Sequence, residues 1–501
     1  MPARSKYSTM TLLIATLTLV CACSDSNNND NNNAADEYLA IGQASVELPP
    51  EAGSPFLLTT VSFDVGSVGY KQEEYFLSGT ATAFTNVNEL GPDGRWQVEP
   101  GATAAYKTRI VIYSPISPAA FSGTVFVEWL NVSAGFETQP SWSAGHTEIL
   151  RAGHAWVGVS AQLVGIEGAP DALLPFDLKT ADPERYASLA HPGDSFSYDI
   201  FSQVAQALRE PGEIDMLQGL EPRQYIALGQ SQGASRLLTY LNAIHPLYNA
   251  YDGYLVHSRY QGSAQLAGPP QTAINSPEKV TIRTDLNVPV LNLQTETDVI
   301  GLGAIASRQP DSSRFRLWEV AGGSHSDYYV NVSGRADKGV DPEIALVVEE
   351  TSVMGFINCE KPMNAGPTHW VVNAALSALH NWVLNGALPA QAERLSTQDD
   401  NTQFRRDELG NTTGGIRTPY LDAPAALLSG DVNEGERFCN LFGTTQLFDA
   451  ATMASLYVDK NGYIEAVSEA TDQALSKGFL LDIDGERIKA AAALQWDALD
   501  N

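Results

Sequence analysis

The sequence is poor in basic residues and in cysteine. Its 501 residues include 30 Lys and Arg against 59 Asp and Glu, and the formal net charge is −29. Phosphates of nucleic acids and anionic lipid surfaces repel such a chain, so we expect neither as a partner. With four cysteines and no zinc-type spacing of Cys and His, the sequence offers no metal motif. The pairs Gly322-Gly323 and Gly414-Gly415 lack the pattern of nucleotide-binding loops, and we expect no cofactor.

The N-terminus resembles a targeting segment. Basic Arg4 and Lys6 precede residues 10–20, an apolar stretch that is too short to span a bilayer as a helix. The dipeptide Ala22-Cys23 follows, and a small residue directly before a cysteine resembles the cleavage site of a bacterial lipoprotein. We therefore predict a signal peptide over residues 1–22.

The new N-terminal residue would then be Cys23, which we predict to carry the lipid. Cys21 is less suitable because the bulky Val20 precedes it. The alternative is an ordinary secretory signal, which would leave the protein periplasmic or secreted. Residues 23–44 include an Asn- and Asp-rich run with nothing to bury, so we expect a disordered tether there. The protein would be exported to the bacterial cell envelope and would touch the membrane only through its lipid anchor.

Apart from the lipid-carrying Cys23, two cysteines remain in the mature chain, Cys359 and Cys439. Exported proteins meet oxidising conditions, so we expect a disulfide between them. Two buried thiols are the alternative.

The most informative motif is Gly229-Gln230-Ser231-Gln232-Gly233. It follows the apolar run 225–228 and precedes the helical-looking run 234–241. A G-x-S-x-G between a strand and a helix is typical of the tight turn that exposes a nucleophilic serine. Side chains beside the serine would clash in this turn, which explains the two glycines.

A nucleophilic serine needs a base, and the base needs an orienting acid. In this motif's chain order the acid precedes the histidine. The strand-like run 288–294 is followed by Asp298, our preferred acid, while Glu296 is the competitor. After the next strand-like run, 315–320, comes His325, our predicted base.

The oxyanion of an acyl-transfer reaction needs two backbone N–H donors. One is expected from Gln232, directly after the serine and at the start of a helix. The other is expected from the loop after the strand at 124–130, where we select Val132.

These motifs make the chain similar to bacterial α/β-hydrolase domain-containing proteins. The similar stretches include residues 127–133, 155–162, 199–203 and 414–419. The resemblance implies a serine hydrolase with Ser231, Asp298 and His325 as its triad. It implies no particular substrate. We expect a small-molecule ester, with amide cleavage or acyl transfer as one alternative and a non-catalytic surface binding protein as another. The sequence does not indicate the oligomeric state.

Strand-like runs alternate with helical ones from residue 123 onward, which predicts a doubly wound, mostly parallel α/β sheet. We expect residues 59–115 to form its antiparallel start, and residues 45–501 to make one α/β-hydrolase domain with a C-terminal extension. Two insertions are predicted, near 162–195 and 330–440, and either could line or cover the site. Within the second, residues 368–384 read as an amphipathic helix that packs against the core.

Overall fold

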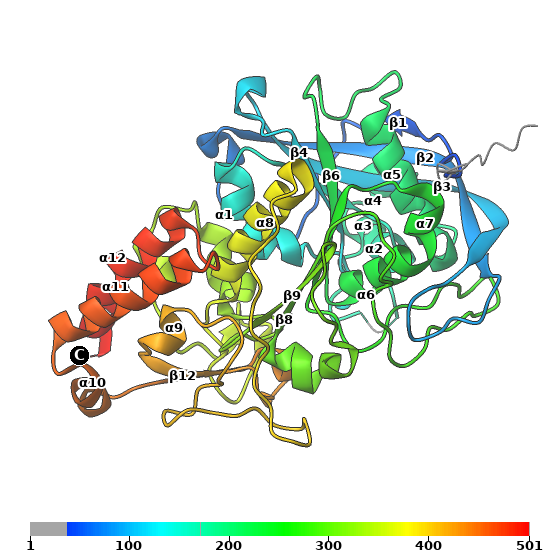
Figure 1. Ribbon diagram of the computed structural model, residues 1–501. Helices are drawn as coiled ribbons and strands as arrows, with labels where there is room; N and C mark the ends of the chain where they lie inside the picture. The colour runs from blue at the N-terminus through cyan, green and yellow to red at the C-terminus, as the bar shows by residue number, and fades with distance from the viewer. Residues whose placement is uncertain (1–37, 171, 500–501) are drawn as a thin grey trace, which may run out of the picture. The chain divides into compact units, whose positions relative to one another are not determined.

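A nine-stranded sheet forms the centre of the fold (Figure 1). The computed structural model describes residues 38–170 and 172–499. The predicted signal peptide, Cys23 and most of the predicted tether therefore lie outside the described residues. The strand order is β1-β2-β3-β5-β4-β6-β7-β8-β9. The strands are β1 Ser45–Glu47, β2 Tyr70–Asn86, β3 Val98–Pro115, β4 Thr124–Trp129, β5 Ala155–Val159, β6 Gln224–Gln230, β7 Gly253–His257, β8 Val290–Thr295 and β9 Phe315–Val320.

The sheet has an antiparallel start and a parallel remainder. Strands β1, β2 and β3 pair antiparallel, as does β3 with β5, whereas β5, β4, β6, β7, β8 and β9 are all parallel. This confirms the predicted doubly wound sheet. The predicted strand positions are also confirmed, with ends that differ by one or two residues. Because the strands are parallel, their carboxyl ends lie on one edge, where ligands bind in open α/β sheets.

Alternation along the buried strands divides the core into two layers. Val125 and Val127 of β4 face a cluster that contains helices α5 and α6, whereas Phe126 faces a cluster that contains α1 and α8. Figure 1 shows these two helix pairs on opposite sides of the sheet. Successive strand residues point to opposite faces, and here both faces are covered, which explains the nearly continuous apolar strands. The longer helices are α1 Pro140–Arg151, α5 Ser197–Arg209, α6 Gln232–Thr239, α8 Thr368–Asn385, α10 Ala450–Tyr457, α11 Lys460–Ser476 and α12 Asp482–Leu499.

Helix α8 is the amphipathic helix predicted near 368–384. Its Leu376, Leu379 and Trp382 are buried in the same cluster as α1. Its role is therefore to cover one face of the sheet, as predicted. Helices α10, α11 and α12 follow as a C-terminal extension (Figure 1), and their buried residues share a hydrophobic cluster with residues 299–428, among them Trp370 of α8. No helix of the described ranges is long and apolar enough to cross a membrane.

The first predicted insertion, 162–195, contains the short helices α2 Leu163–Glu167, α3 Leu178–Ala181 and α4 Pro183–Tyr186. A buried ionic network ties it to the sheet. Arg185 of α4 donates to Glu74 of β2 at 2.6 Å. Arg109 of β3, fully buried, contacts the same Glu74 at 3.7 Å and also pairs with Glu137.

The second predicted insertion, 330–440, contains α8, α9 Pro419–Asp422 and the two-stranded sheet of β10 Ser352–Val353 and β11 Ile357–Asn358. It also contains strand β12 Ala426–Ser429, which pairs with β13 Thr444–Leu447; β13 follows the insertion. The expected disulfide between Cys359 and Cys439 is confirmed, with Cα atoms 5.5 Å apart. The remaining short helix, α7 His245–Tyr248, follows α6.

Candidate active site

The turn between β6 and α6 has the strained geometry that the glycine spacing predicts. Ser231 has φ 57° and ψ −117°, a conformation that non-glycine residues rarely adopt. A Cβ on Gly229 would lie 2.7 Å from the Gly233 carbonyl oxygen, and a Cβ on Gly233 would lie 2.7 Å from that of Trp129. Neither position therefore has room for a side chain. The turn lifts the Ser231 hydroxyl above the carboxyl edge of the sheet.

Three side chains from three parallel strands meet at this edge. The Nε2 atom of His325, in the loop after β9, is 2.8 Å from Ser231 Oγ. The Nδ1 atom of the same ring is 2.6 Å from Oδ1 of Asp298, just after β8. The structure therefore brings together all three residues predicted from chain order. A serine hydroxyl, an imidazole and a buried carboxylate in this sequence can generate a nucleophile at neutral pH.

Asp298 is held rigidly in its place. Its side chain is fully buried, and Oδ2 accepts hydrogen bonds from the Thr295 amide at 2.7 Å and the Thr295 hydroxyl at 2.8 Å. These two bonds occupy one carboxylate oxygen and leave the other for His325. The carboxylate thus fixes which nitrogen of the ring carries the proton and which way the ring faces.

Glu296, the competing acid, has a different position. Its Oε1 accepts from the Gly322 amide at 2.6 Å and its Oε2 from the Gly430 amide at 2.9 Å. Gly322 begins the loop that carries His325, so Glu296 anchors that loop without touching the imidazole. The loop is held a second time by Gln230, whose side-chain amide donates to the His325 carbonyl at 3.0 Å.

The predicted oxyanion donors lie beside each other. Gln232 is the first residue of α6, and the first amides of a helix have no acceptor within the helix. The Val132 amide points to Oε1 of the Gln232 side chain at 3.4 Å, longer than a typical hydrogen bond. Gln162 Nε2 donates to the same Oε1 at 3.0 Å, and Gln162 Oε1 accepts in turn from Gln232 Nε2. This reciprocal amide pair fixes the Gln232 side chain next to Val132.

Burial governs the charges around the triad. The pKa of His257, at the end of β7, is lowered to about 4. Burial is the main cause, Asp298 partly opposes the shift, and His325 adds to it. His257 is therefore neutral at pH 7. Burial also raises the pKa of Asp327 to about 7 and raises that of Glu296. Within residues 38–170 and 172–499, no group of three or more His, Cys, Asp and Glu side chains is arranged to hold a metal ion.

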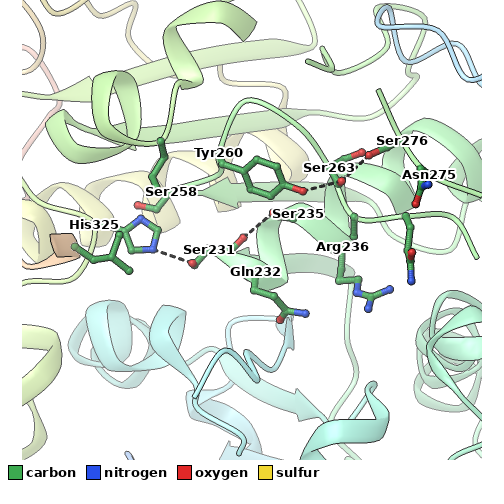
Figure 2. Close-up of a pocket in the computed structure, with 14 residues that line it drawn as sticks. Ser231, Gln232, Ser235, Arg236, Ser258, Tyr260, Ser263, Asn275, Ser276 and His325 are labelled. Carbon is green, nitrogen blue, oxygen red and sulfur yellow. Dashed lines mark hydrogen bonds between the residues drawn. The ribbon is translucent and has the colours of Figure 1, made fainter. Parts of the chain in front are cut away.

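Two cavities open at the serine. One, of about 600 Å³, is the more polar of the two and extends along α6 toward residues 258–276; Figure 2 shows Ser231 and His325 at one end of it. The other, of about 290 Å³, is apolar and extends toward residues of both predicted insertions. Ser231 and His325 border both cavities.

Several residues of this site were not singled out from the sequence. Thr295 and Gln230 serve the triad through hydrogen bonds that no motif indicates. Gln162 ended one of the stretches that resemble the hydrolase proteins, which was the only signal for it. Its partner Gln232 lies 70 residues away, a separation that local patterns do not span.

Similar folds occur among solved structures. A lidless α/β serine hydrolase from Xanthomonas campestris is 13% identical, with 48% of this chain and 84% of that chain covered and a TM-score of 0.25. A fungal esterase from Rhizomucor miehei is 12% identical, with 51% of this chain and 78% of that chain covered and a TM-score of 0.25. Acetyl xylan esterase 1 from a Thermoanaerobacterium species is 8% identical, with 56% of this chain and 81% of that chain covered and a TM-score of 0.26.

No curated protein sequence matches this chain significantly. The fold and the site geometry agree with the sequence family that the chain matches. The alpha/beta hydrolase domain family matches residues 42–490, most of the chain, and the protein therefore belongs to that family.

Proposed function

We propose that the protein is a serine hydrolase that cleaves carboxylic esters through an acyl-enzyme. The observation that carries this proposal is the hydrogen-bonded series from Ser231 Oγ through His325 to Asp298, with lengths of 2.8 and 2.6 Å. The strained backbone of Ser231 adds support, since strain of this kind is typically retained where function needs it.

The reaction begins when Ser231 Oγ attacks the ester carbonyl carbon and His325 Nε2 takes the hydroxyl proton. Asp298 stabilises the imidazolium that forms. The C–O bond to the alcohol then breaks, and the proton passes from Nε2 to the departing oxygen. Water, deprotonated by His325, attacks the acyl carbon. The bond from that carbon to Ser231 Oγ then breaks, His325 returns the proton to Oγ, and the free acid leaves.

The oxyanion is stabilised by backbone N–H groups. The Gln232 amide, at the positive end of α6, is one donor. The Val132 amide is the second, since its 3.4 Å contact with the Gln232 side chain is weak enough for a developing negative charge to replace it. Loss of one such donor typically lowers kcat by about 10²–10³.

The first experiment measures hydrolysis of p-nitrophenyl acetate and labelling by a fluorophosphonate. The Ser231→Ala variant should lose labelling and lower kcat by roughly 10⁶. Ser197→Ala is the matched control, because Ser197 is a buried serine on α5 that borders neither cavity. Undiminished turnover in Ser231→Ala would reject the proposal. Labelling of the wild type with no ester turnover, but with turnover of aryl amides or transfer to added alcohols, would favour the amidase or acyltransferase alternative. Absence of both labelling and turnover would favour a binding protein.

We further propose that the protein is exported and anchored by a lipid on Cys23. The Cys359–Cys439 disulfide supports export, since such bonds persist in oxidising compartments. Fractionation of cells should place the wild type with membranes and a Cys23→Ser variant in the soluble fraction. Equal distribution of the two proteins would exclude an anchor at this residue.

A further inference from the structure

An ester carbonyl at Ser231 carries two substituents, and two cavities meet at Ser231. The cavities share Ser231, His325 and Leu441 but otherwise have different walls. One substituent can therefore occupy each cavity while the carbonyl carbon sits at the serine. The contrast between the two walls indicates what each substituent is.

The smaller cavity is apolar. Phenylalanine and aliphatic side chains from three distant parts of the chain form its walls, among them Phe136, Phe176, Val353, Ile357 and Phe442. Phe136 and Phe442 are buried, which keeps water out of its inner end. Arg335, Asn131 and Asn331 also line this cavity, but most of its wall is apolar. Burial of an apolar group there gains free energy, whereas a hydroxyl-rich group would lose water over most of its surface without compensation.

The larger cavity is lined by many hydroxyls and amides, together with the apolar Ala264, Leu302 and Leu441. Its polar walls come from Ser235, Ser258, Ser263, Ser276, Gln265 and Asn275. The one Arg among its described lining residues is Arg236, and its guanidinium is paired with Asp194 at 2.6 Å. No carboxylate lines this cavity in the described part of the chain. The wall therefore presents neutral hydrogen-bonding groups and a cation that is already neutralised.

Two hydroxyls of this wall are buried without a partner. Ser258 is fully buried and Ser263 is 5% exposed, and neither Oγ has a hydrogen-bond partner within the described residues. Burying an unpaired hydroxyl costs free energy, so a ligand that supplies partners would be favoured. The Tyr260 ring, 37% exposed, lies beside them with its hydroxyl bonded to the Ser263 carbonyl at 2.7 Å (Figure 2). Its exposed ring can pack against the C–H face of a ligand.

Given the proposed ester hydrolysis, we infer that the substrate is an amphiphilic ester. Its acyl group is an apolar chain or ring in the smaller cavity, and its alcohol is a neutral, hydroxyl-rich group of the sugar or polyol type in the larger one. Which half occupies which cavity follows from the route by which the alcohol leaves and water enters. The alcohol leaves first and water must replace it, and the polar side offers that route past exposed Asn275. The apolar side is walled at its inner end by the buried Phe136 and Phe442, which hold the acyl group in place until water attacks.

The test compares esters that differ in one half at a time, all below their micelle concentrations. Glucose hexanoate should exceed both glucose acetate and methyl hexanoate in kcat/KM by about tenfold or more. Hexyl gluconate, which reverses the two halves, should be a poor substrate, as should carboxymethyl hexanoate, whose alcohol half is anionic. Preference for hexyl gluconate would overturn the order of the halves. Preference for carboxymethyl hexanoate would overturn the neutral alcohol, and equal rates would overturn the amphiphilic substrate.

Two variants test whether the larger cavity selects the alcohol and the smaller cavity selects the acyl group. Ser263→Ala should lower kcat/KM for glucose hexanoate about tenfold more than for methyl hexanoate, because it removes a hydroxyl that makes no internal bond. Val330→Phe, which narrows the apolar cavity, should lower the hexanoate to acetate ratio of the glucose esters. The control Ser197→Ala removes another buried, unpartnered hydroxyl away from both cavities and should leave every ratio unchanged. Unchanged ratios in Ser263→Ala and Val330→Phe with unaltered melting temperatures would refute the assignment.

Failure of this inference is distinguishable from failure of the proposed hydrolysis. A protein that cleaves p-nitrophenyl acetate but shows no preference within the panel is a hydrolase of another selectivity. If no ester is cleaved, calorimetric titration of the Ser231→Ala variant with hexyl β-glucoside still tests the two cavities. Saturable binding that Ser263→Ala weakens about tenfold supports them, and absence of binding overturns them.

Discussion

Replacement of Asp298 by Asn tests the triad more sharply than removal of the serine does. Asp298 Oδ2 serves the two Thr295 donors, while Oδ1 serves His325. In the Asp298→Asn variant the amide oxygen can keep both Thr295 bonds, which turns the amide NH₂ toward His325 Nδ1. Since that NH₂ donates, Nδ1 must become the acceptor, and the ring proton moves to Nε2. Nε2 can then no longer accept the proton of Ser231.

The expected loss follows from this change of tautomer. An Asp-to-Asn change in such a triad lowers kcat by about 10⁴. At about 1.36 kcal/mol for each factor of ten, the transition state loses about 5.4 kcal/mol. The fold should survive, since the side chain keeps its shape and its three hydrogen bonds persist as neutral ones, which are weaker than bonds to a charged carboxylate.

Glu296→Gln is the matched control, because Glu296 is an equally buried carboxyl two residues away. The amide can serve only one of Gly322 and Gly430 as acceptor, so unfolding should become easier by about 1–3 kcal/mol. Its kcat should stay within about tenfold of wild type. The assay is initial-rate hydrolysis of p-nitrophenyl acetate, with urea unfolding to measure stability. A slow Glu296→Gln and a fast Asp298→Asn would exchange the roles of the two acids and refute the reasoning.

Three further perturbations test the fold. Replacing both Cys359 and Cys439 by Ser opens a loop of 80 residues and should lower the free energy of unfolding by up to about 4.5 kcal/mol in urea titrations; no change would mean that the loop is already constrained. Arg109→Met leaves the buried Glu137 without its cation and Glu74 with Arg185 alone, and should cost about 3–5 kcal/mol by the same measurement, whereas a loss below about 1 kcal/mol would show that the ion pairs of Arg109 add little stability. His257 has a pKa lowered by burial to about 4, so between pH 6.5 and 4 the unfolded chain binds a proton that the folded chain does not, and stability falls as the pH falls. In a His257→Gln variant, the free energy of unfolding should fall by about 3 kcal/mol less than in the wild type over this pH range. Parallel plots of unfolding free energy against pH for the two proteins would contradict the lowered pKa of His257.

Local pattern and chain order were sufficient to predict the sheet and the three residues at its edge. Buried parallel strands are recognisable as short apolar runs, and the elbow needs glycine on both sides of Ser231 for steric reasons that act within a few residues. The sequence distinguishes less well between Glu296 and Asp298 as the triad acid, because both follow β8. It depends on the turn at Thr297–Gly301, which brings Asp298 back under His325 while Glu296 points to Gly322.

The two cavities could not be predicted in the same way. The apolar walls combine Phe136, Phe176, Val353 and Phe442, which belong to segments with no common pattern. The Gln162–Gln232 pair joins the loop after β5 to the start of α6 and depends on both backbones being in place. Such contacts are properties of the assembled fold, so the sequence indicated the type of chemistry before it indicated the shape of the substrate.

The disulfide links chemistry to cellular location. Ile357 lies two residues before Cys359 and Phe442 three residues after Cys439, and both side chains contribute to the acyl wall. In the reducing cytoplasm the two thiols would stay separate, and this part of the wall would be held by non-covalent contacts alone. If the chain is exported as proposed, it would gain this covalent link only after oxidation outside the cytoplasm, and the discrimination among acyl groups that we infer would reach its final form at that stage.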